Sequence, residues 1–210
     1  MLTVAAGTSS EVELDIRKSR FIGFLCPVSS EELAREAIVA RRKYFPDARH
    51  HCSAFVLESD GATPQTRFSD DGEPGGTAGA PILNALLGAG LVDVVAVVTR
   101  YFGGTLLGTG GLVRAYSGAT QAAIQSAQLA RIETVPFFSA EFDPALAGRW
   151  EAEIRGRGWG VEQVNWGNTV AIDFRVPPGE QDEVESLFAQ SARGQVSLRR
   201  YPDQRVEILL

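Results

Sequence analysis

A strand, a glycine-rich loop and a helix follow one another in VDVVAVVTRYFGGTLLGTGGLVRAYSGATQAAIQSA, residues 92–127. Residues 92–98 are almost continuously apolar, which is typical of a buried strand. Residues 103–111 are rich in glycine and predict a loop, whereas residues 112–127 repeat apolar side chains at helical intervals. A buried strand that leads into a helix in this way predicts an α/β fold.

The residues before this stretch predict more strands and helices. A polar link at residues 17–19 joins two strand-like runs, and Ser29 stands three residues before Glu32, which is the spacing of a capping box. Residues 67–77 hold too many Gly, Pro and carboxylate residues for a regular element, so they predict an ordered loop. The expected strands are 11–16, 21–28 and 51–58, and the expected helices are 33–44 and 81–87.

The residues after this stretch follow a different pattern. Strands are expected at 137–142, 160–164, 170–176 and 206–209, with helices at 145–155 and 180–192. This is the order βαββαβ of ferredoxin-like domains. Because Pro136 follows the last β-branched run of the first part, we place a boundary near residues 134–136. The chain is therefore expected to form two domains, residues 1–134 and 135–210, of the mixed α/β (α+β) class.

Composition restricts the class of protein. The chain has 210 residues, 44% of them apolar and 22% charged, as in a globular protein with a continuous core. It has no apolar run near the ~20 residues of a membrane span, and its start lacks the features of a secretory signal. We therefore expect a cytoplasmic protein that does not cross a membrane. The net charge of −6 argues against a protein that coats nucleic acid, so any site for a polyanion must be a local patch.

Three carboxylates, on Asp70, Asp71 and Glu73, lie in the loop that ends at Thr77. Adjacent carboxylates repel each other unless they are solvated, paired with cations or bound to a metal. The loop can therefore bind Mg²⁺ or supply a general base, or it can be a tight turn whose side chains accept hydrogen bonds from backbone amides. The spacing is not that of an EF-hand. The sequence leaves both roles open.

The glycine-rich loop has the composition of an anion site. Free amides at the start of a helix favour phosphate, and glycines let a ligand approach the backbone. Thr109 stands where a Walker-type loop requires Lys, and the spacing is not GxGxxG, so neither kind of nucleotide loop is present. The same glycines can instead allow close packing of helix on sheet and turns with positive φ. The candidate residues in and beside this loop are Tyr101, Gly103, Gly104, Gly108, Gly110 and Gly111.

Basic residues lie near both loops. Arginine suits bidentate contact with phosphate, so several of these residues can converge on one anion. His50 and His51 are neighbours in a predicted strand and are expected on opposite faces of it, which disfavours a catalytic pair. The candidate residues are Arg49, His50, His51, Arg67, Arg100 and Arg114.

The two cysteines offer no obvious chemistry. Cys26 and Cys52 lie in strand-like apolar sequence and lack CxxC spacing, so buried, reduced thiols are expected. No nucleophile stands out elsewhere, and catalytic residues and metal ligands are therefore left unassigned.

Several long motifs match a known family. The segments ARHHC (48–52), DDGEPGGTAG (70–79), TRYFGG (99–104) and LGTGGLVRAY (107–116), together with KSRFI (18–22), resemble the IMPACT family, in its bacterial YigZ-like branch. The resemblance covers the whole chain and is strongest over about residues 15–125. The sequence departs from the family at Leu106, where many relatives have Lys.

The resemblance implies a fold and a field of function. It implies an N-terminal βα domain like the second domain of ribosomal protein S-five and a ferredoxin-like C-terminal domain similar to the last domain of elongation factor G. It also implies association with RNA or the translation machinery. Eukaryotic relatives regulate translation with an additional binding domain that this sequence lacks, so their partner is not carried over.

Three functions follow as expectations. The first is a non-enzymatic, RNA- or ribosome-associated regulator that binds phosphate through the glycine loop and the arginines and requires no cofactor. The second is an enzyme or sensor for a small phosphorylated ligand, with Mg²⁺ at Asp70, Asp71 and Glu73. The third is a protein-interaction module that uses the exposed sheet face of the second domain. The sequence does not indicate an oligomeric state.

Overall fold

The computed structural model describes residues 1–58, 63–191 and 196–210. They divide into two compact units, Met1–Ile132 with Glu207–Leu210, and Glu133–Val206. Both units combine helices with a sheet, which confirms the predicted mixed α/β class. Within the described residues, no helix has the length and apolar character that crossing a membrane requires.

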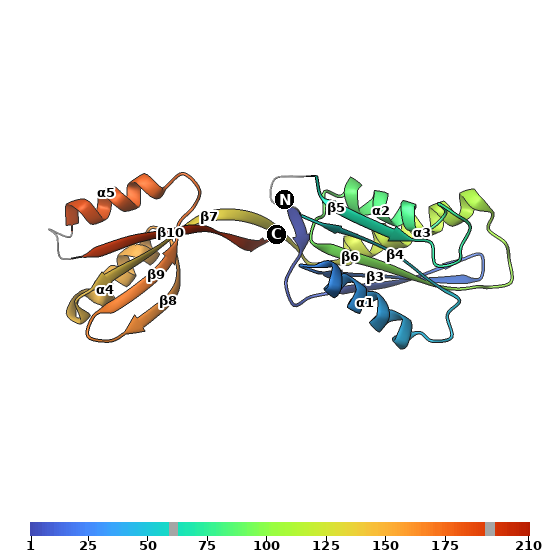
Figure 1. The fold of residues 1–210 in the computed structure, drawn as a ribbon, viewed down its shortest axis with the longest axis horizontal. Coiled ribbons are helices and arrows are strands. Elements are labelled where there is room, and N and C mark those ends of the chain that lie inside the picture. The colour runs from blue at the N-terminus through green and yellow to red at the C-terminus, as the bar shows by residue number, and fades with distance from the viewer. Residues whose placement is uncertain (59–62, 192–195) are drawn as a thin grey trace. The chain divides into compact units, whose positions relative to one another are not determined.

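Five strands form the sheet of the first unit (Figure 1). Their order is β2 (Ser10–Ile16), β3 (Ser19–Pro27), β6 (Val94–Tyr101), β4 (His50–Leu57) and β5 (Gln65–Ser69). Every neighbouring pair is antiparallel. β4 and β6 lie inside the sheet and are almost entirely buried. Burial on both faces explains why β6 begins with a continuous apolar run, Val94–Val98, rather than with an alternation.

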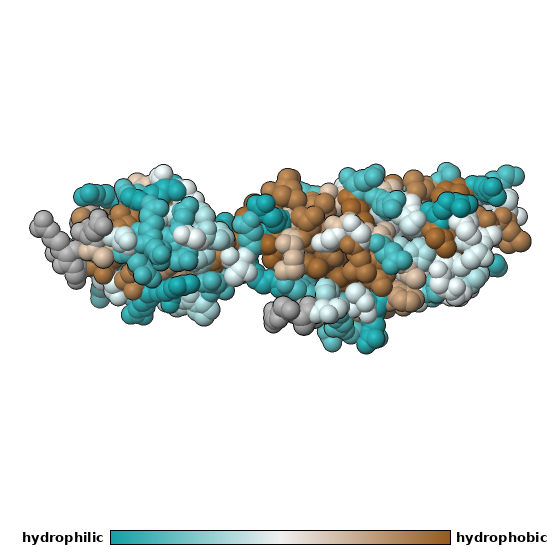
Figure 2. All heavy atoms as spheres, turned by 90° about the horizontal axis from the view of Figure 1, so that it is seen from above, coloured by the Kyte–Doolittle hydropathy of each residue, from teal (hydrophilic) through white to brown (hydrophobic). Residues whose placement is uncertain are grey.

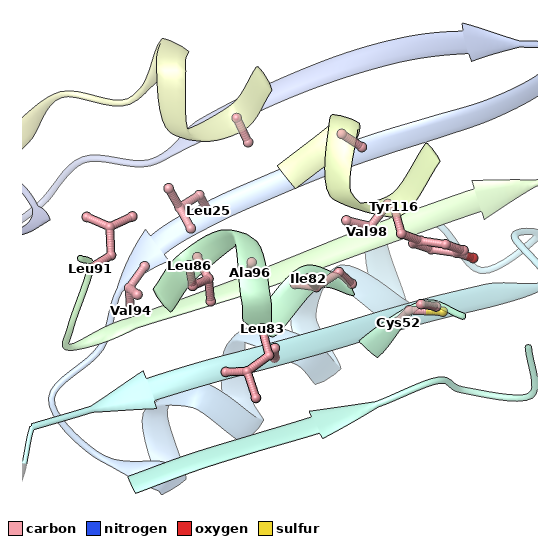
Figure 3. Packing of buried hydrophobic residues seen from close by; sticks show 14 of the residues in the cluster. Leu25, Cys52, Ile82, Leu83, Leu86, Leu91, Val94, Ala96, Val98 and Tyr116 are labelled. Carbon is pink, nitrogen blue, oxygen red and sulfur yellow. The ribbon is translucent and has the colours of Figure 1, made fainter. Parts of the chain in front are cut away.

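Three helices cover the two faces of this sheet. α1 (Glu31–Tyr44) packs on one face, where Val95 of β6 is buried. α2 (Gly79–Gly88) and α3 (Thr109–Ser126) pack on the other face over Ala96, which belongs to the larger cluster (Figure 3). Successive side chains of a strand point to opposite faces, so β6 contributes to both clusters.

α3 lies unusually close to the sheet at Gly23 of β3. A Cβ atom at Gly23 would collide with the carbonyl oxygen of Ala119, so only glycine fits there. Nearby, the Ser10 hydroxyl donates to the carbonyl oxygen of Ala123 at 2.6 Å. These contacts fix the position of α3 and therefore the position of its N-terminus.

The second unit has the predicted βαββαβ order. Its elements are β7 (Leu129–Phe142), α4 (Pro144–Gly156), β8 (Gly160–Trp166), β9 (Val170–Arg175), α5 (Gln181–Ser191) and β10 (Ser197–Leu209). β9 lies between β7 and β8, and β10 pairs with β7. Aromatic rings dominate the core, where Phe174 stacks near Phe138, Trp159 and Phe188. The ferredoxin-like order predicted from sequence is therefore confirmed.

Several predicted boundaries are wrong. The N-cap of α1 is Ser30, whose Oγ accepts from the amide of Leu33 at 3.2 Å, not Ser29. The expected loop at 67–77 begins too early, because Arg67 still pairs with Phe55 of β4. β7 begins at residue 129, whereas a strand was expected only from residue 137. β1 (Leu2–Val4), which pairs with the start of β7, has no counterpart in the prediction.

Candidate functional site

A cleft of about 440 Å³ opens in the first unit beside the glycine loop. It lies between the start of β4, the acidic loop, the end of β6 and the first turn of α3. The residues that line it are Arg49, His50, Glu73, Pro74, Arg100, Phe102, Leu106, Leu107, Gly108, Thr109 and Leu112. The tertiary structure thus brings together five of the residues predicted to form the site: Arg49, His50, Glu73, Arg100 and Gly108.

The N-terminus of α3 opens into this cleft. The helix begins at Thr109, earlier than the sequence pattern predicts, and its N-cap is Gly108 with φ 70°. No side chain of the described residues caps it. Leu112 donates to the Gly108 carbonyl, whereas an α-helix provides no internal acceptor for the preceding amides of its first turn. These amides and the helix dipole give this wall of the cleft a partial positive charge.

The glycines of the loop have different roles. A Cβ atom at Gly103 would collide with the Lys18 backbone, and the Gly103 amide donates to Ser19 Oγ at 3.2 Å, so this residue serves close packing. Gly104 has φ 82°, which favours glycine at a turn. A Cβ at Gly111 would lie 2.9 Å from the Cβ of Leu107. The close packing and the positive φ that the sequence analysis named as one of two roles are therefore present in this loop.

A buried ion pair forms one wall of the cleft. Glu73 Oε1 accepts from Arg100 Nη1 at 2.6 Å and from the Tyr116 hydroxyl at 2.7 Å. The side chains of Glu73 and Arg100 are only 4% and 6% exposed. Burial and the nearby Cys52 and Glu73 raise the pKa of Tyr116, so its hydroxyl stays a donor. Because Glu73 neutralises Arg100, this arginine brings no net positive charge to the cleft.

Asp70 organises the acidic loop. Its carboxylate accepts from the amides of Gly76, Ala78 and Gly79 at 2.8 to 3.0 Å. Burial by itself would raise the pKa of Asp70, but the three amide hydrogen bonds outweigh it and lower the pKa. In the same loop the Thr77 hydroxyl donates to the Pro74 carbonyl at 2.7 Å. These contacts are those of a tight turn.

Asp71 ties the loop to β4 and α1. Its carboxylate accepts from the His51 amide at 2.6 Å and from Arg42 Nη2 at 2.8 Å. Burial opposes ionisation, but these hydrogen bonds and the charge of Arg42 lower the pKa of Asp71. All three predicted metal-loop carboxylates therefore have protein partners, which an ion such as Mg²⁺ would have to displace. The described residues contain no group of His, Cys, Asp and Glu arranged to hold a metal ion.

The two histidines point to opposite sides of β4, as strand alternation predicts. His50 lines the cleft, with its Nε2 4.0 Å from Glu73 Oε1 and its Nδ1 2.8 Å from the Asp71 carbonyl oxygen. His51 is buried away from the cleft, and its Nδ1 lies 3.1 Å from Thr99 Oγ1. Burial and the nearby arginines lower the pKa of His51, which favours the neutral ring.

Three other predicted residues lie outside the cleft lining. Arg67 lines a separate groove with Glu31 and Arg35. The Tyr101 ring stacks under the Arg20 guanidinium, 4.7 Å from the ring centre. Arg114 lies on α3, where its Nη1 is 3.6 Å from the position of a Cβ at Gly110, so its charge is beside the first turn of the helix. Of these, only Arg114 is near the helix N-terminus.

Apolar residues form a part of the cleft that the sequence analysis did not select. Phe102 and Leu106 are 43% and 83% exposed, and Leu107 and Leu112 continue this wall. Figure 2 shows such apolar side chains reaching the surface of the first unit among polar ones. The sequence did contain a signal for these residues. Phe and Leu stand inside a glycine loop, where no helix or strand exists to bury them.

Comparisons with known proteins place this architecture in one family. Residues 17–124, which include every cleft residue, match the Impact N-terminal domain, and residues 141–195 match a domain of unknown function, DUF1949. The chain is 48% identical over 191 residues to the IMPACT family member YigZ of Escherichia coli, covering 88% of this chain and 90% of that protein. The chain belongs to the IMPACT family.

Two further comparisons extend over most of the chain, one with an IMPACT family member and one with a solved structure. The family member YvyE of Bacillus subtilis is 33% identical over 192 residues, covering 91% of this chain and 87% of that protein. The crystal structure of a hypothetical protein aligns with 36% identity and a TM-score of 0.60, covering 94% of this chain and 95% of that one. The IMPACT family resemblance seen in the sequence is therefore confirmed for both parts of the chain.

Proposed function

We propose that this IMPACT-family protein is an RNA- or ribosome-associated regulator of translation, and that the cleft binds a phosphate group. The observation that carries the proposal is the position of the first turn of α3, which opens into the same cleft as Arg49 and His50. Uncapped amides at a helix N-terminus favour an anion, and an arginine beside them strengthens the contact.

The charges around the cleft determine how such binding behaves. Arg49 is exposed and forms no ion pair within the described part of the chain, so its guanidinium is available to a ligand. Arg100 is neutralised by Glu73, and the whole chain carries a charge of −6. Binding therefore rests on few phosphate contacts, so it should be weak and should weaken further as salt concentration rises.

The setting in translation comes from the family resemblance. The fold that the resemblance implies is shared with ribosomal and elongation-factor domains, whose ligands are RNA and the ribosome. A phosphate site at a helix N-terminus supplies affinity for such ligands without reading their sequence. The second unit adds an exposed sheet surface on which a protein partner can also bind.

Co-sedimentation with ribosomes tests the proposal. Wild-type protein is compared with Thr109→Asp, which places a carboxylate at the helix N-terminus, and with Arg49→Ala, at low and at moderate salt. Both variants should lose ribosome association, and Thr109→Asp should keep its stability because an acidic residue there is favourable to the helix. Arg149→Ala, at an exposed arginine of the second unit, is the matched control.

Arg100→Ala is a poor probe of ribosome binding, since it would leave Glu73 buried without its cation.

The proposal is supported if association with ribosomes is sensitive to salt, is lost in Thr109→Asp and in Arg49→Ala, and is preserved in Arg149→Ala. Absence of the wild-type protein from ribosomal and RNA-bound fractions at low salt contradicts it.

A small phosphorylated ligand is the second candidate, because a cleft of about 440 Å³ lies within the usual size range of small-molecule sites. A thermal shift with nucleotides, measured with and without Mg²⁺, tests it. A shift that needs Mg²⁺ and disappears in Asp71→Asn would favour this candidate and its metal. The same shift without Mg²⁺ would favour the phosphate site alone.

A further inference from the structure

The lining of the cleft combines two chemically different groups of residues. The polar group consists of Arg49, His50 and the first turn of α3 at Thr109. The apolar group consists of Phe102, Leu106 and Leu107. A phosphate ion alone uses the polar group and leaves the apolar group without a partner, so the lining indicates a ligand that carries both an anion and an apolar, flat group.

In the apolar group, Phe102 is exposed but held in place. Phe102 is 43% exposed, and the Arg100 guanidinium lies 5.6 Å from the centre of its ring. Arg100 is itself held by Glu73 at 2.6 Å. The buried ion pair therefore supports one side of an aromatic ring whose remaining surface is open to a ligand. An aromatic ring presented in this way is suited to stacking with a base.

A second observation at the same place also indicates a ligand. Arg100 is 5% exposed and lines the cleft, and its Nε has no hydrogen-bond acceptor among the described residues. A buried donor without an acceptor costs free energy, which a ligand can relieve only if its binding brings an acceptor to this atom. The helix N-terminus is thus not the only feature of this cleft that lacks a partner.

Building on the phosphate site proposed above, we infer that the cleft takes one nucleotide of single-stranded RNA. The phosphate lies at the N-terminus of α3 and at Arg49, and the base packs against Phe102 and the neighbouring leucines. The volume of about 440 Å³ suits a ligand of this size. Bases in a duplex are stacked and paired, so an RNA duplex cannot place one in the cleft without unpairing it.

Fluorescence anisotropy with a short oligoadenylate tests the inference. The same oligomer without its bases keeps the phosphates but should bind about 5-fold to 150-fold more weakly, since stacking of one base contributes roughly that factor. Phe102→Ala should lower affinity for the intact oligomer by a similar factor and leave affinity for the abasic oligomer unchanged. Leu87→Ala, at an apolar α2 residue that is 46% exposed, is the control and should bind like wild type.

The outcomes separate the base site from the phosphate site. Equal affinity of wild-type protein for the intact and abasic oligomers overturns the base site while the phosphate site stands. Equal affinity for a duplex overturns the single-strand requirement. Adenosine monophosphate is also added as a competitor. If it displaces the oligomer at a concentration equal to or below the dissociation constant of the oligomer, the cleft is a site for free nucleotide instead of RNA. Failure of wild-type protein to bind any oligomer at low salt overturns both proposals.

Discussion

The hydroxyl of Tyr116 on α3 donates to Glu73 Oε1 at 2.7 Å, at the oxygen that also accepts from Arg100 of β6. One carboxylate therefore joins the acidic loop, the central strand and the helix whose N-terminus opens into the cleft. Figure 3 shows the Tyr116 side chain at the same end of the buried cluster as Cys52. The same hydrogen bonds therefore position the walls of the cleft and stabilise the first unit.

Removal of the Glu73 carboxylate should lower the free energy of unfolding far more than removal of the Tyr116 hydroxyl. Glu73→Ala leaves the Arg100 charge buried without a partner, so the free energy of unfolding should fall by about 3–5 kcal/mol. Tyr116→Phe removes one hydrogen bond and should lower it by about 1 kcal/mol. Urea denaturation measures both. Glu153→Ala, which removes an exposed pair with Arg157, should change stability by less than about 0.5 kcal/mol. Similar losses in all three variants would contradict the buried network.

Two glycines should respond in opposite directions to alanine. At Gly103 the new methyl group collides with the Lys18 backbone, so Gly103→Ala should destabilise the protein by about 1–3 kcal/mol. Gly118 lies in the middle of α3 with no heavy atom within 4 Å of its added Cβ, so Gly118→Ala should stabilise by up to about 1 kcal/mol. Thermal unfolding distinguishes them. A neutral Gly103→Ala would show that loop and strand do not approach as closely as described.

Stability should depend on pH through Asp70. Its pKa is lower in the folded protein than in the unfolded chain, because three amides bind the ionised form against the opposing effect of burial. The folded state thus binds fewer protons, and this contribution is present above the unfolded pKa, about 3.9, and is lost as pH falls through the folded pKa.

Asp70→Asn lacks this contribution at every pH. The difference in unfolding free energy between wild type and Asp70→Asn should therefore be largest near about pH 7 and shrink below about pH 4. Urea titrations at both pH values measure it, with the exposed Asp15→Asn as control. A difference that stays constant with pH would rule out the ionised carboxylate as the acceptor.

The two thiols should be unreactive in the folded protein. Burial raises the pKa of Cys52 to about 12 and that of Cys26 to about 11, so little thiolate forms near neutral pH. Iodoacetamide at about pH 8 should label neither cysteine in native protein and both in urea, as measured by mass spectrometry. Rapid labelling of native Cys52 would mean that the cluster around Tyr116 opens readily.

Much of the fold could be predicted from local sequence. The apolar run that became β6 and the helical period that became α3 are local patterns, and so is the βαββαβ order of the second unit. β1 and the first half of β7 could not be predicted in this way. They are strands because they pair with each other, as Leu2 does with Arg131, and such pairing leaves no periodic signal in either segment.

The candidate site was predicted only in part. Glycine composition indicated an anion loop, and strand alternation placed His50 and His51 on opposite sides. Composition also suggested that Arg67, Arg100 and Arg114 converge on phosphate. In the structure Arg67 lies in another groove, because its place in β5 follows from pairing with β4. A charge pattern along the chain does not reveal which face of a sheet each residue reaches.

The sequence by itself determined the mixed α/β class, the family and the existence of a glycine loop before a helix. Only the tertiary structure decided that Glu73 pairs with Arg100, 27 residues away, and that Phe102 and Leu106 join the cleft. The physical reason is that backbone preferences and hydrophobic periods are local properties of the chain. Burial of a charge, and the partner that neutralises it, depend instead on which distant segments fold against one another.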